Sequence, residues 1–376
     1  FLDWFHSGSY ALSIQFISLR LRFRRNTWMD VQRPLPRLPL LHLMAGTIVL
    51  LAALLAGPVA VRADSFVLLA TYDGVINPVT AEYLHDALLS AQDNGAQALI
   101  IRLNTPGGLD PSMRLIIKDI TAATIPVVVY VAPSSSRAAS AGLFITMAAH
   151  VAAMAPGTNI GAAHPVAIGG GEMDKTMKEK VENDSVAYLK SITSQRGRNV
   201  AWVEDAVRKS VSVTEREALK LKIIDLVAEN LSALLKQLDG RTISLQPGQT
   251  VLHTASATLR EYPMGLRLEF LKTLSEPNIA YLLMTLGTIG LIAELYNPGA
   301  ILPGVVGAIS LILAFYSLQS LPVNYAGVLL FLLGIVFFVL EASVTSYGVL
   351  AIGGVISMLL GSVMLIKTDA EFLQIS

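Results

Sequence analysis

The 376-residue sequence contains no cysteine, which excludes disulfide bonds, thiolate nucleophiles and cysteine-based zinc sites. Charge of one sign is not in excess either: 28 Lys and Arg balance 28 Asp and Glu, so the positive surface that a nucleic-acid partner requires is missing. The sequence shows no clear acidic cluster and no nucleotide-binding motif, so we expect neither a metal nor a cofactor. Charged residues make up only 15% and hydrophobic residues 53%. A wholly soluble protein is less apolar than this, and membrane segments are therefore expected.

The first 63 residues have the features of an export signal rather than of a folded domain. Reading from Met29, two arginines precede a largely apolar stretch that ends at Ala63, a small residue of the kind that signal peptidases require. We therefore expect residues 1–28 to be an upstream translated extension and residues 29–63 to be a signal peptide or an N-terminal anchor. The chain beyond them is then exported.

Between residues 65 and 227, short apolar runs alternate with amphipathic segments. The apolar runs are 65–76, 98–103, 126–131, 151–155 and 223–227, and the helical segments are 78–91, 111–122, 139–149 and 174–196. This alternation predicts an α/β domain over residues 64–229, with a parallel sheet joined by right-handed crossovers. The loops after its strands lie at the carboxyl edge of the sheet, where α/β proteins place their sites.

The last hundred residues are much more apolar than the α/β domain. Residues 230–276 are mixed in character and are predicted as a connector. Four apolar segments follow with almost no charge between them, each long enough to cross a bilayer: 279–296, 301–318, 325–341 and 347–366. We predict a membrane domain of four helices over residues 277–367 and a tail over 368–376.

This membrane part repeats itself at an offset of 47 residues. Gly287 matches Gly334, and Glu294 matches Glu341. The repeat predicts two copies of a helix pair, whose small residues let the helices approach closely. Glu294 and Glu341 are expected to lie at the membrane interface and hydrogen-bond a helix hairpin, with a proton path as the alternative.

Two short strings in the α/β domain point to acyl transfer. The string RAASAG (residues 137–142) places the unhindered Ser140 at the start of an apolar helical run. The string NTPGG (residues 104–108) ends a buried strand about thirty residues earlier. Together they predict a nucleophilic serine opposite a glycine pair.

The residues around this serine have expected roles as well. The N–H groups of Gly108 and Ala141 are predicted to form an oxyanion hole. Gly107 and Gly142 are expected to border the substrate, because the absence of a Cβ lets a peptide backbone approach closely.

A serine hydroxyl needs a base within hydrogen-bond reach. Three candidates stand downstream of Ser140: His150, His164 and Lys180. His150 comes too soon after the serine helix and is expected to cap or pack.

With these strings, the chain resembles the NfeD family of membrane-bound, Clp-protease-like serine proteases, relatives of the signal peptide peptidase A group. The strings MAPGTNIGA (residues 154–162) and AYLK (residues 187–190) follow the first two in the family's order, and the resemblance covers roughly residues 65–366. It implies a Clp-protease or crotonase-like α/β fold and a Ser–Lys dyad whose base is Lys180. Longer members carry a small OB-type barrel after the last span, which we expect to be absent or truncated here.

The residues themselves leave the base open between Lys180 and His164. Lys180 lies in a charged run typical of an exposed face, and it serves as a base only if the glycine-rich residues 167–171 let the helix fold over the site and a bound peptide excludes water. His164 follows Ser140 by 24 residues, close to the spacing in soluble Clp proteases, and needs no large pKa shift. Only Asp205 and Asp225 stand as possible partners to complete a triad with it.

We therefore predict an exported, membrane-anchored serine endopeptidase in which Ser140 attacks the scissile carbonyl and Lys180 takes its proton. The resemblance implies hydrophobic C-terminal segments of stomatin- or prohibitin-like proteins as substrates. It also implies a multi-pass protein of the bacterial inner membrane, in contact with the lipid bilayer, with its protease domain on the exported side; a homodimer or larger oligomer is expected. The alternatives are a non-enzymatic membrane scaffold for a stomatin-like partner, Ser–His catalysis through His164, and a crotonase-type reaction on an acyl thioester.

Overall fold

The computed structural model describes residues 65–166, 174–246, 248–297, 301–319, 324–343 and 346–365. The expected extension and signal or anchor over residues 1–63, the glycine-rich residues 167–171 and the tail over 368–376 lie outside these ranges.

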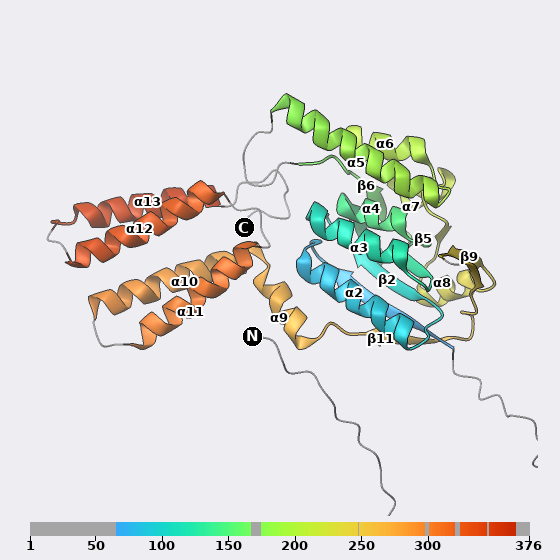
Figure 1. Ribbon diagram of the computed structural model, residues 1–376, viewed down its shortest axis with the longest axis horizontal. Helices are drawn as coiled ribbons and strands as arrows, with labels where there is room; N and C mark the ends of the chain where they lie inside the picture. Colours follow the sequence, from blue (N-terminus) through green and yellow to red (C-terminus); the bar gives the residue numbers. More distant parts are fainter. Residues whose placement is uncertain are drawn as a thin grey trace, which may run out of the picture. The chain divides into compact units, whose positions relative to one another are not determined.

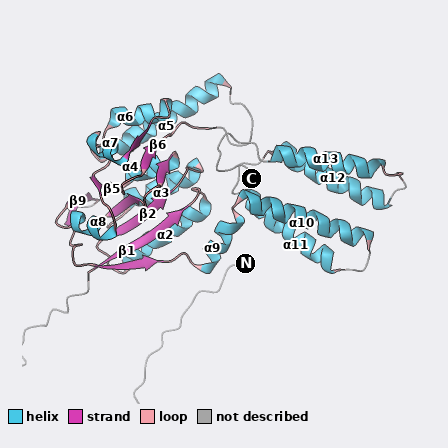
Figure 2. Ribbon diagram, turned by 180° about the vertical axis from the view of Figure 1, so that it is seen from behind, coloured by secondary structure: helices cyan, strands magenta, loops and turns pink. Residues whose placement is uncertain are grey.

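A six-stranded sheet organises the α/β domain, with all its strand pairs parallel and the order β11-β1-β2-β3-β5-β8. Figure 2 shows the strands of the domain in magenta among its helices. Its strands are β1 (Phe66–Asp73), β2 (Leu99–Asn104), β3 (Val127–Val131), β5 (Val151–Met154), β8 (Leu226–Val227) and β11 (Thr258–Tyr262). Neighbouring residues of β1 enter opposite cores: Leu68 packs on one face of the sheet, and Val67 and Leu69 pack on the other. Burial on both faces explains why the strands read as continuous apolar runs. The predicted α/β fold with a parallel sheet is confirmed.

Helices cover the sheet on both faces (Figure 1). The larger core is built with α2 (Pro78–Asp93), α3 (Asp110–Ala122), α4 (Ala141–Ala148), α5 (Lys175–Gln195) and α6 (Val200–Arg208). The smaller core is built with α8 (Leu231–Leu238) and the hairpin of β9 (Thr242–Leu245) and β10 (Gly248–Val251). Local sequence sets the helix starts: Asn77 caps α2 by accepting the N–H of Thr80 (3.0 Å), and Pro78 occupies the first turn.

The segment predicted as a connector, residues 230–276, contributes to the domain itself. It contains α8, the β9–β10 hairpin, β11 and α9 (Leu266–Leu274). Strand β11 pairs with β1 from Phe66↔Thr258 to Ala70↔Tyr262 and forms the edge of the main sheet. It reads Thr-Leu-Arg-Glu-Tyr and is partly exposed, so it lacks the apolar run that marks the inner strands.

A second, three-stranded sheet lies beside the first, and its strands are too short for a sequence pattern to reveal. Its strands are β4 (Arg137–Ala139), β6 (Asn159–Gly161) and β7 (Ser212–Thr214), and α7 (Glu215–Lys220) follows β7. The string RAASAG contains β4, and the string MAPGTNIGA contains β6.

Four apolar helices follow the α/β domain as two hairpins, α10 (Pro277–Tyr296) with α11 (Leu302–Gln319) and α12 (Tyr325–Ser343) with α13 (Val349–Leu365). Among the described residues, only α10 has both the length and the hydropathy of a membrane span. The apolar stretches of the other three are shorter: Leu302–Leu318, Ala326–Glu341 and Val349–Met364.

The predicted repeat reappears as equivalent contacts in the two hairpins. A Cβ at Gly287 would lie 2.6 Å from Cγ of Leu311, and a Cβ at Gly334 would lie 2.4 Å from Cγ of Met358. Leu311 and Met358 are themselves 47 residues apart. In each hairpin the two helices thus approach so closely at one position that only glycine fits there.

Glu341 stabilises the second hairpin. Its carboxylate accepts the N–H groups of Gly348 (2.9 Å) and Ala351 (3.1 Å) and the hydroxyl of Ser346, at the start of α13. This is the hairpin role expected for it. For Glu294, the buried Oε2 has no hydrogen-bond partner among the described residues, which omit the turn at 298–300.

Candidate active site

Ser140 occupies the sharp turn between β4 and α4. Its φ of 52° and ψ of −115° lie in a region that residues other than glycine rarely adopt. The N–H of Ser140 donates to the carbonyl of Gly161 (3.0 Å), which holds the turn. Although Ser140 is the N-cap residue of α4, its hydroxyl makes no capping hydrogen bond. A strained strand–serine–helix turn with a free hydroxyl is typical of nucleophilic serines.

The loop after β2 is bonded directly to this serine turn. The N–H of Thr105 donates to the carbonyl of Arg137 (2.8 Å), and the carbonyl of Thr105 accepts the N–H of Ala139 (3.1 Å). Oδ1 of Asn104 accepts the N–H of Arg137 (2.9 Å). The strings NTPGG and RAASAG therefore form one structural unit.

Three glycines near Ser140 sit where no side chain fits. A Cβ at Gly107 would lie 2.7 Å from Cβ of Ser140, one at Gly108 would lie 2.1 Å from the carbonyl oxygen of Ile76, and one at Gly142 would lie 2.6 Å from Cγ2 of Thr105. Gly107 thus lies directly against Ser140, and its expected contact with the substrate stays a prediction. Gly142, expected to border the substrate, is instead buried and packs on the glycine loop.

Replacing Gly107 by alanine tests this close approach. At a φ of 130° alanine is strained, and its methyl group displaces Ser140. Because a misplacement of about 1 Å at a reacting group costs roughly 10²-fold in rate, we expect peptide cleavage to fall by about that factor. The matched control is Gly95→Ala, which also has a positive φ (66°) but open space around it, and which should keep full activity. Wild-type cleavage rates for Gly107→Ala would contradict the placement.

The N–H groups of Gly108 and Ala141 are the ones predicted to form an oxyanion hole. The loop hydrogen bonds beside them run from the N–H of Ile76 to the carbonyl of Gly107 (2.8 Å) and from the N–H of Leu109 to the carbonyl of Ile76 (2.8 Å). Within the described ranges, neither the N–H of Gly108 nor that of Ala141 has an acceptor. Ala141 is the first residue of α4, where the helix dipole adds positive potential.

A cleft of about 420 Å³ opens at these groups. It brings together Ser140, Gly108, Ala141 and Lys180, which the sequence proposed as the catalytic set. Its other lining residues are mostly apolar: Asp110, Met113, Arg114, Phe144, Ala163, Pro165, Val166, Met177, Val181, Asp184 and Ser185. Lys180 is exposed, and among the described residues its amine has no hydrogen-bond or ion-pair partner.

Helix α5, which carries Lys180, is anchored just after that residue on one side by α3. A guanidinium nitrogen of Arg114 donates to Asp184 (2.7 Å), and Nε of Arg114 donates to Asp110 (2.8 Å). The same guanidinium lies 4.3 Å from the ring centroid of Tyr188. Burial lowers the pKa of Arg114, but the hydrogen bonds and charges of Asp110 and Asp184 outweigh it, so the pKa lies above its ordinary value.

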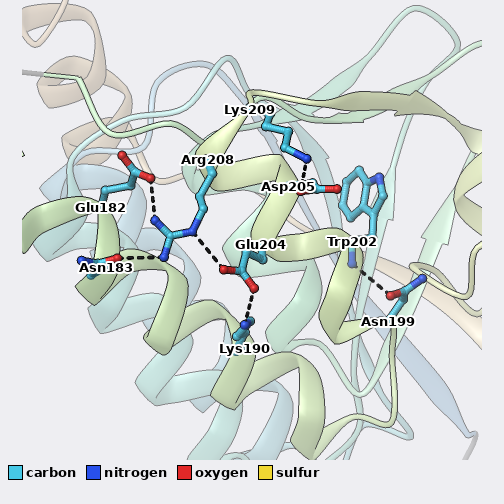
Figure 3. Close-up of polar contacts among 9 residues, drawn as sticks. All are labelled: Glu182, Asn183, Lys190, Asn199, Trp202, Glu204, Asp205, Arg208 and Lys209. Carbon is cyan, nitrogen blue, oxygen red and sulfur yellow. Dashed lines mark hydrogen bonds and ion pairs between the residues drawn. The ribbon is translucent and has the colours of Figure 1, made fainter. Parts of the chain in front are cut away.

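On the other side, α6 anchors α5 through Arg208 (Figure 3). Arg208 donates to Glu182 and Asn183 of α5, both at 2.8 Å, and to Glu204 of its own helix (2.9 Å). Glu204 also pairs with Lys190 of α5. The six residues 175–180, which precede these anchors, are all exposed. Lys180 therefore lies where the exposed first part of α5 meets the part that α3 and α6 anchor.

His164, the alternative base, has a different environment. Its Nδ1 lies 3.0 Å from the carbonyl oxygen of Val207, and it does not line the cleft. Of its two suggested orienting carboxylates, Asp205 pairs with Lys209 (3.0 Å), and Asp225 pairs with Arg198 and accepts the N–H of Ala152 (2.7 Å). Among the described residues, no carboxylate hydrogen-bonds His164.

His150 has a structural role. Its Nδ1 accepts the N–H of Val127 (3.2 Å), and burial, reinforced by the charges of Arg196 and Arg198, lowers its pKa to about 3. In the unfolded chain this histidine binds a proton near its ordinary pKa of 6.5. The fold is thus fully stable with respect to this group above pH 6.5 and loses stability as the pH falls from there towards 3.

We therefore expect His150→Asn to flatten the pH dependence of stability. Between pH 7 and pH 5 the variant should lose about 2 kcal/mol less unfolding free energy than the wild type, because asparagine does not titrate. Urea unfolding of the full chain in detergent at both pH values measures the difference. The exposed His253→Asn serves as the control, and equal pH dependence in all three proteins would contradict the assignment.

Among the described residues, no group of three or more His, Asp or Glu side chains is placed to hold a metal ion.

Comparisons with known proteins match both parts of the chain. The family model described as the NfeD1b N-terminal domain matches residues 70–245, and that of the NfeD integral membrane domain matches residues 278–376. The membrane-bound protease PH1510 of Pyrococcus horikoshii is 34% identical over 323 residues, covering 85% of this chain and 73% of its own. The membrane protein NfeD1b of Bacillus subtilis is 30% identical over 295 residues, covering 74% of this chain and 63% of its own.

Solved structures match the α/β domain. A lysine-to-alanine mutant of the 1510-N membrane-bound stomatin-specific protease, in complex with a substrate peptide, superposes with a TM-score of 0.53 and 31% identity. It covers 56% of this chain and 98% of that one. A serine-to-alanine mutant of the same protease gives a TM-score of 0.51 with 33% identity, covering 54% of this chain and all of that one.

Proposed function

Because the chain belongs to the NfeD family, we propose that this membrane protease is a serine endopeptidase with a Ser140–Lys180 dyad. The observation that carries the proposal is the cleft, which Ser140, Lys180, Gly108 and Ala141 line together. The mutated serine and lysine of the related 1510-N protease stand 41 positions apart in its numbering, and Ser140 and Lys180 are 40 apart here.

The proposed reaction starts with transfer of the Ser140 proton to the neutral amine of Lys180 as Oγ attacks the scissile carbonyl carbon. The N–H groups of Gly108 and Ala141 stabilise the resulting oxyanion. Lys180 then returns the proton to the leaving amine, and the C–N bond breaks to leave an acyl ester on Ser140. Water, deprotonated by Lys180, hydrolyses this ester and restores the serine.

A lysine acts as a base only when its amine is neutral, and water around an exposed amine favours the charged form. The exposed position of Lys180 therefore supports a site that is completed by its substrate. A peptide bound in the cleft removes water from both the amine and the hydroxyl, which favours the neutral amine.

The apolar lining of the cleft, including Met113, Phe144 and Val181, favours an apolar peptide segment. We propose that the substrate is such a segment of a stomatin-like membrane protein, since the related protease is described as stomatin-specific. We further propose four membrane spans and an α/β domain on the exported side; a dimer or larger oligomer remains the expected assembly.

Anchoring of α5 provides a test of the dyad geometry. We expect Arg114→Gln to lower kcat for an apolar peptide by about tenfold, because α5 loses its bonds to α3 and Lys180 is held less firmly. The control is Arg216→Gln, whose side chain is 91% exposed on α7. Unchanged kcat in Arg114→Gln would show that this anchor does not position the base.

The experiment that tests the function itself is cleavage of an apolar peptide by the full chain in lipid nanodiscs, followed by mass spectrometry. We expect internal cleavage products that require the cleft residues. Specific binding of a stomatin-like protein without any cleavage would favour the scaffold alternative.

A further inference from the structure

Helix α9 has an apolar face that nothing covers among the described residues. Leu266 is 86% exposed and Phe270, one turn later, is 56% exposed. Residues four apart lie on the same side of a helix, so the two side chains form one patch. The opposite side of α9 is anchored, since Leu268 is buried in the larger core.

The helix is also held by a polar contact, so the patch has a fixed orientation. Arg267 donates to Glu82 of α2 through Nη1 (2.6 Å). The hydrogen bond to Glu82 and the negative charge of that carboxylate raise the pKa of Arg267 above its ordinary value. An exposed leucine and phenylalanine side by side on a firmly held helix indicate a surface that contacts lipid or another protein.

The position of α9 in the chain identifies that medium. It ends at Leu274, and α10, the clearest membrane span, begins three residues later at Pro277. The carbonyl of Leu274 accepts a hydrogen bond from Ser317 near the end of α11. The start of α10 and the end of α11 therefore both lie beside the end of α9, which places this end of the helix at a membrane–water boundary.

Aromatic side chains support the same boundary. Tyr281 lies in the second turn of α10, and Tyr316 lies in the last turn of α11, close enough to Arg267 to affect it electrostatically. Tyrosines at the ends of spans, next to basic residues, mark the headgroup level of a bilayer.

We infer that α9 is an interfacial helix whose Leu266 and Phe270 enter the headgroup region of the same bilayer that holds the C-terminal helices. The occupant of the patch is lipid, because α9 leads directly into the membrane segment α10. Two exposed charged residues, Arg267 and Glu269, flank the patch on α9. A helix that exposes apolar side chains on one side and is joined to a span lies in the interface in this way. The inference uses only α9 and its neighbours and does not depend on catalysis.

The absence of cysteine makes the test direct. Single-cysteine variants Leu266→Cys and Phe270→Cys of the full chain are spin-labelled in nanodiscs of phosphatidylcholine and phosphatidylglycerol. Power-saturation EPR then compares the accessibility of each label to oxygen, which enters lipid, with its accessibility to a water-soluble nickel chelate. Leu219→Cys, at a 42% exposed leucine on α7, is the control for an exposed apolar site outside the interface.

The ratio of oxygen to nickel accessibility should be higher at positions 266 and 270 than at 219. If circular dichroism shows that one of the two substitutions prevents folding, the ratio at the other position is compared with that at 219. A ratio at both positions equal to that at 219 would overturn the inference. So would dipolar coupling between labels on two chains without oxygen accessibility, since a second copy would then cover the patch.

Discussion

Replacing Ser140 by alanine is expected to lower the cleavage rate of an apolar peptide by about four to six orders of magnitude, the range seen when a nucleophilic serine is removed. Alanine removes the only atom that forms the acyl bond and leaves the fold intact, because the Ser140 hydroxyl makes no capping contact. Initial rates with the full chain in nanodiscs measure the effect, and binding of the uncut peptide should persist.

The matched control is Ser185→Ala, which removes another hydroxyl that lines the same cleft. Its rate should equal that of the wild type. If Ser140→Ala cleaves as well as Ser185→Ala does, Ser140 is not the nucleophile.

The second large effect concerns the base. Lys180→Met keeps the length of the side chain but removes the amine, and we expect kcat to fall by about 10²–10⁴-fold, the typical contribution of a general base. Lys178→Met, two residues earlier on the same exposed stretch of α5, should leave kcat unchanged.

His164→Gln distinguishes the two candidate bases. The carbonyl of Val207 holds its ring, and no described carboxylate orients it, so this variant should retain activity. Loss of activity in His164→Gln together with full activity in Lys180→Met would assign the base to the histidine instead.

The inner part of the fold could be predicted because its strands are buried on both faces. Val127–Val131 is apolar at every position, and such runs signal parallel strands directly. Strand β11 could not be found in this way. Its residues are partly exposed, and its pairing with β1 joins positions almost two hundred residues apart, which no local pattern encodes.

The same distinction applies to the candidate site. Ser140 and the glycines are visible in the sequence because a small-residue string is itself the signal. The anchor from Arg114 to Asp184 is not, since those residues are 70 positions apart. Only its local half, Asp110 and Arg114 four residues apart on one helix, could have suggested that this arginine is held in place.

An active-site phosphonate reacts covalently with a nucleophilic serine, so the residue that it modifies identifies the nucleophile. The full chain in nanodiscs is incubated with a fluorophosphonate and an apolar peptide, digested, and mapped by mass spectrometry. We expect one adduct, on Ser140, which is lost in Lys180→Met and retained in His164→Gln. An adduct on another residue that abolishes cleavage while Ser140 stays unmodified would contradict this assignment, and so would continued cleavage by chains whose Ser140 is fully modified.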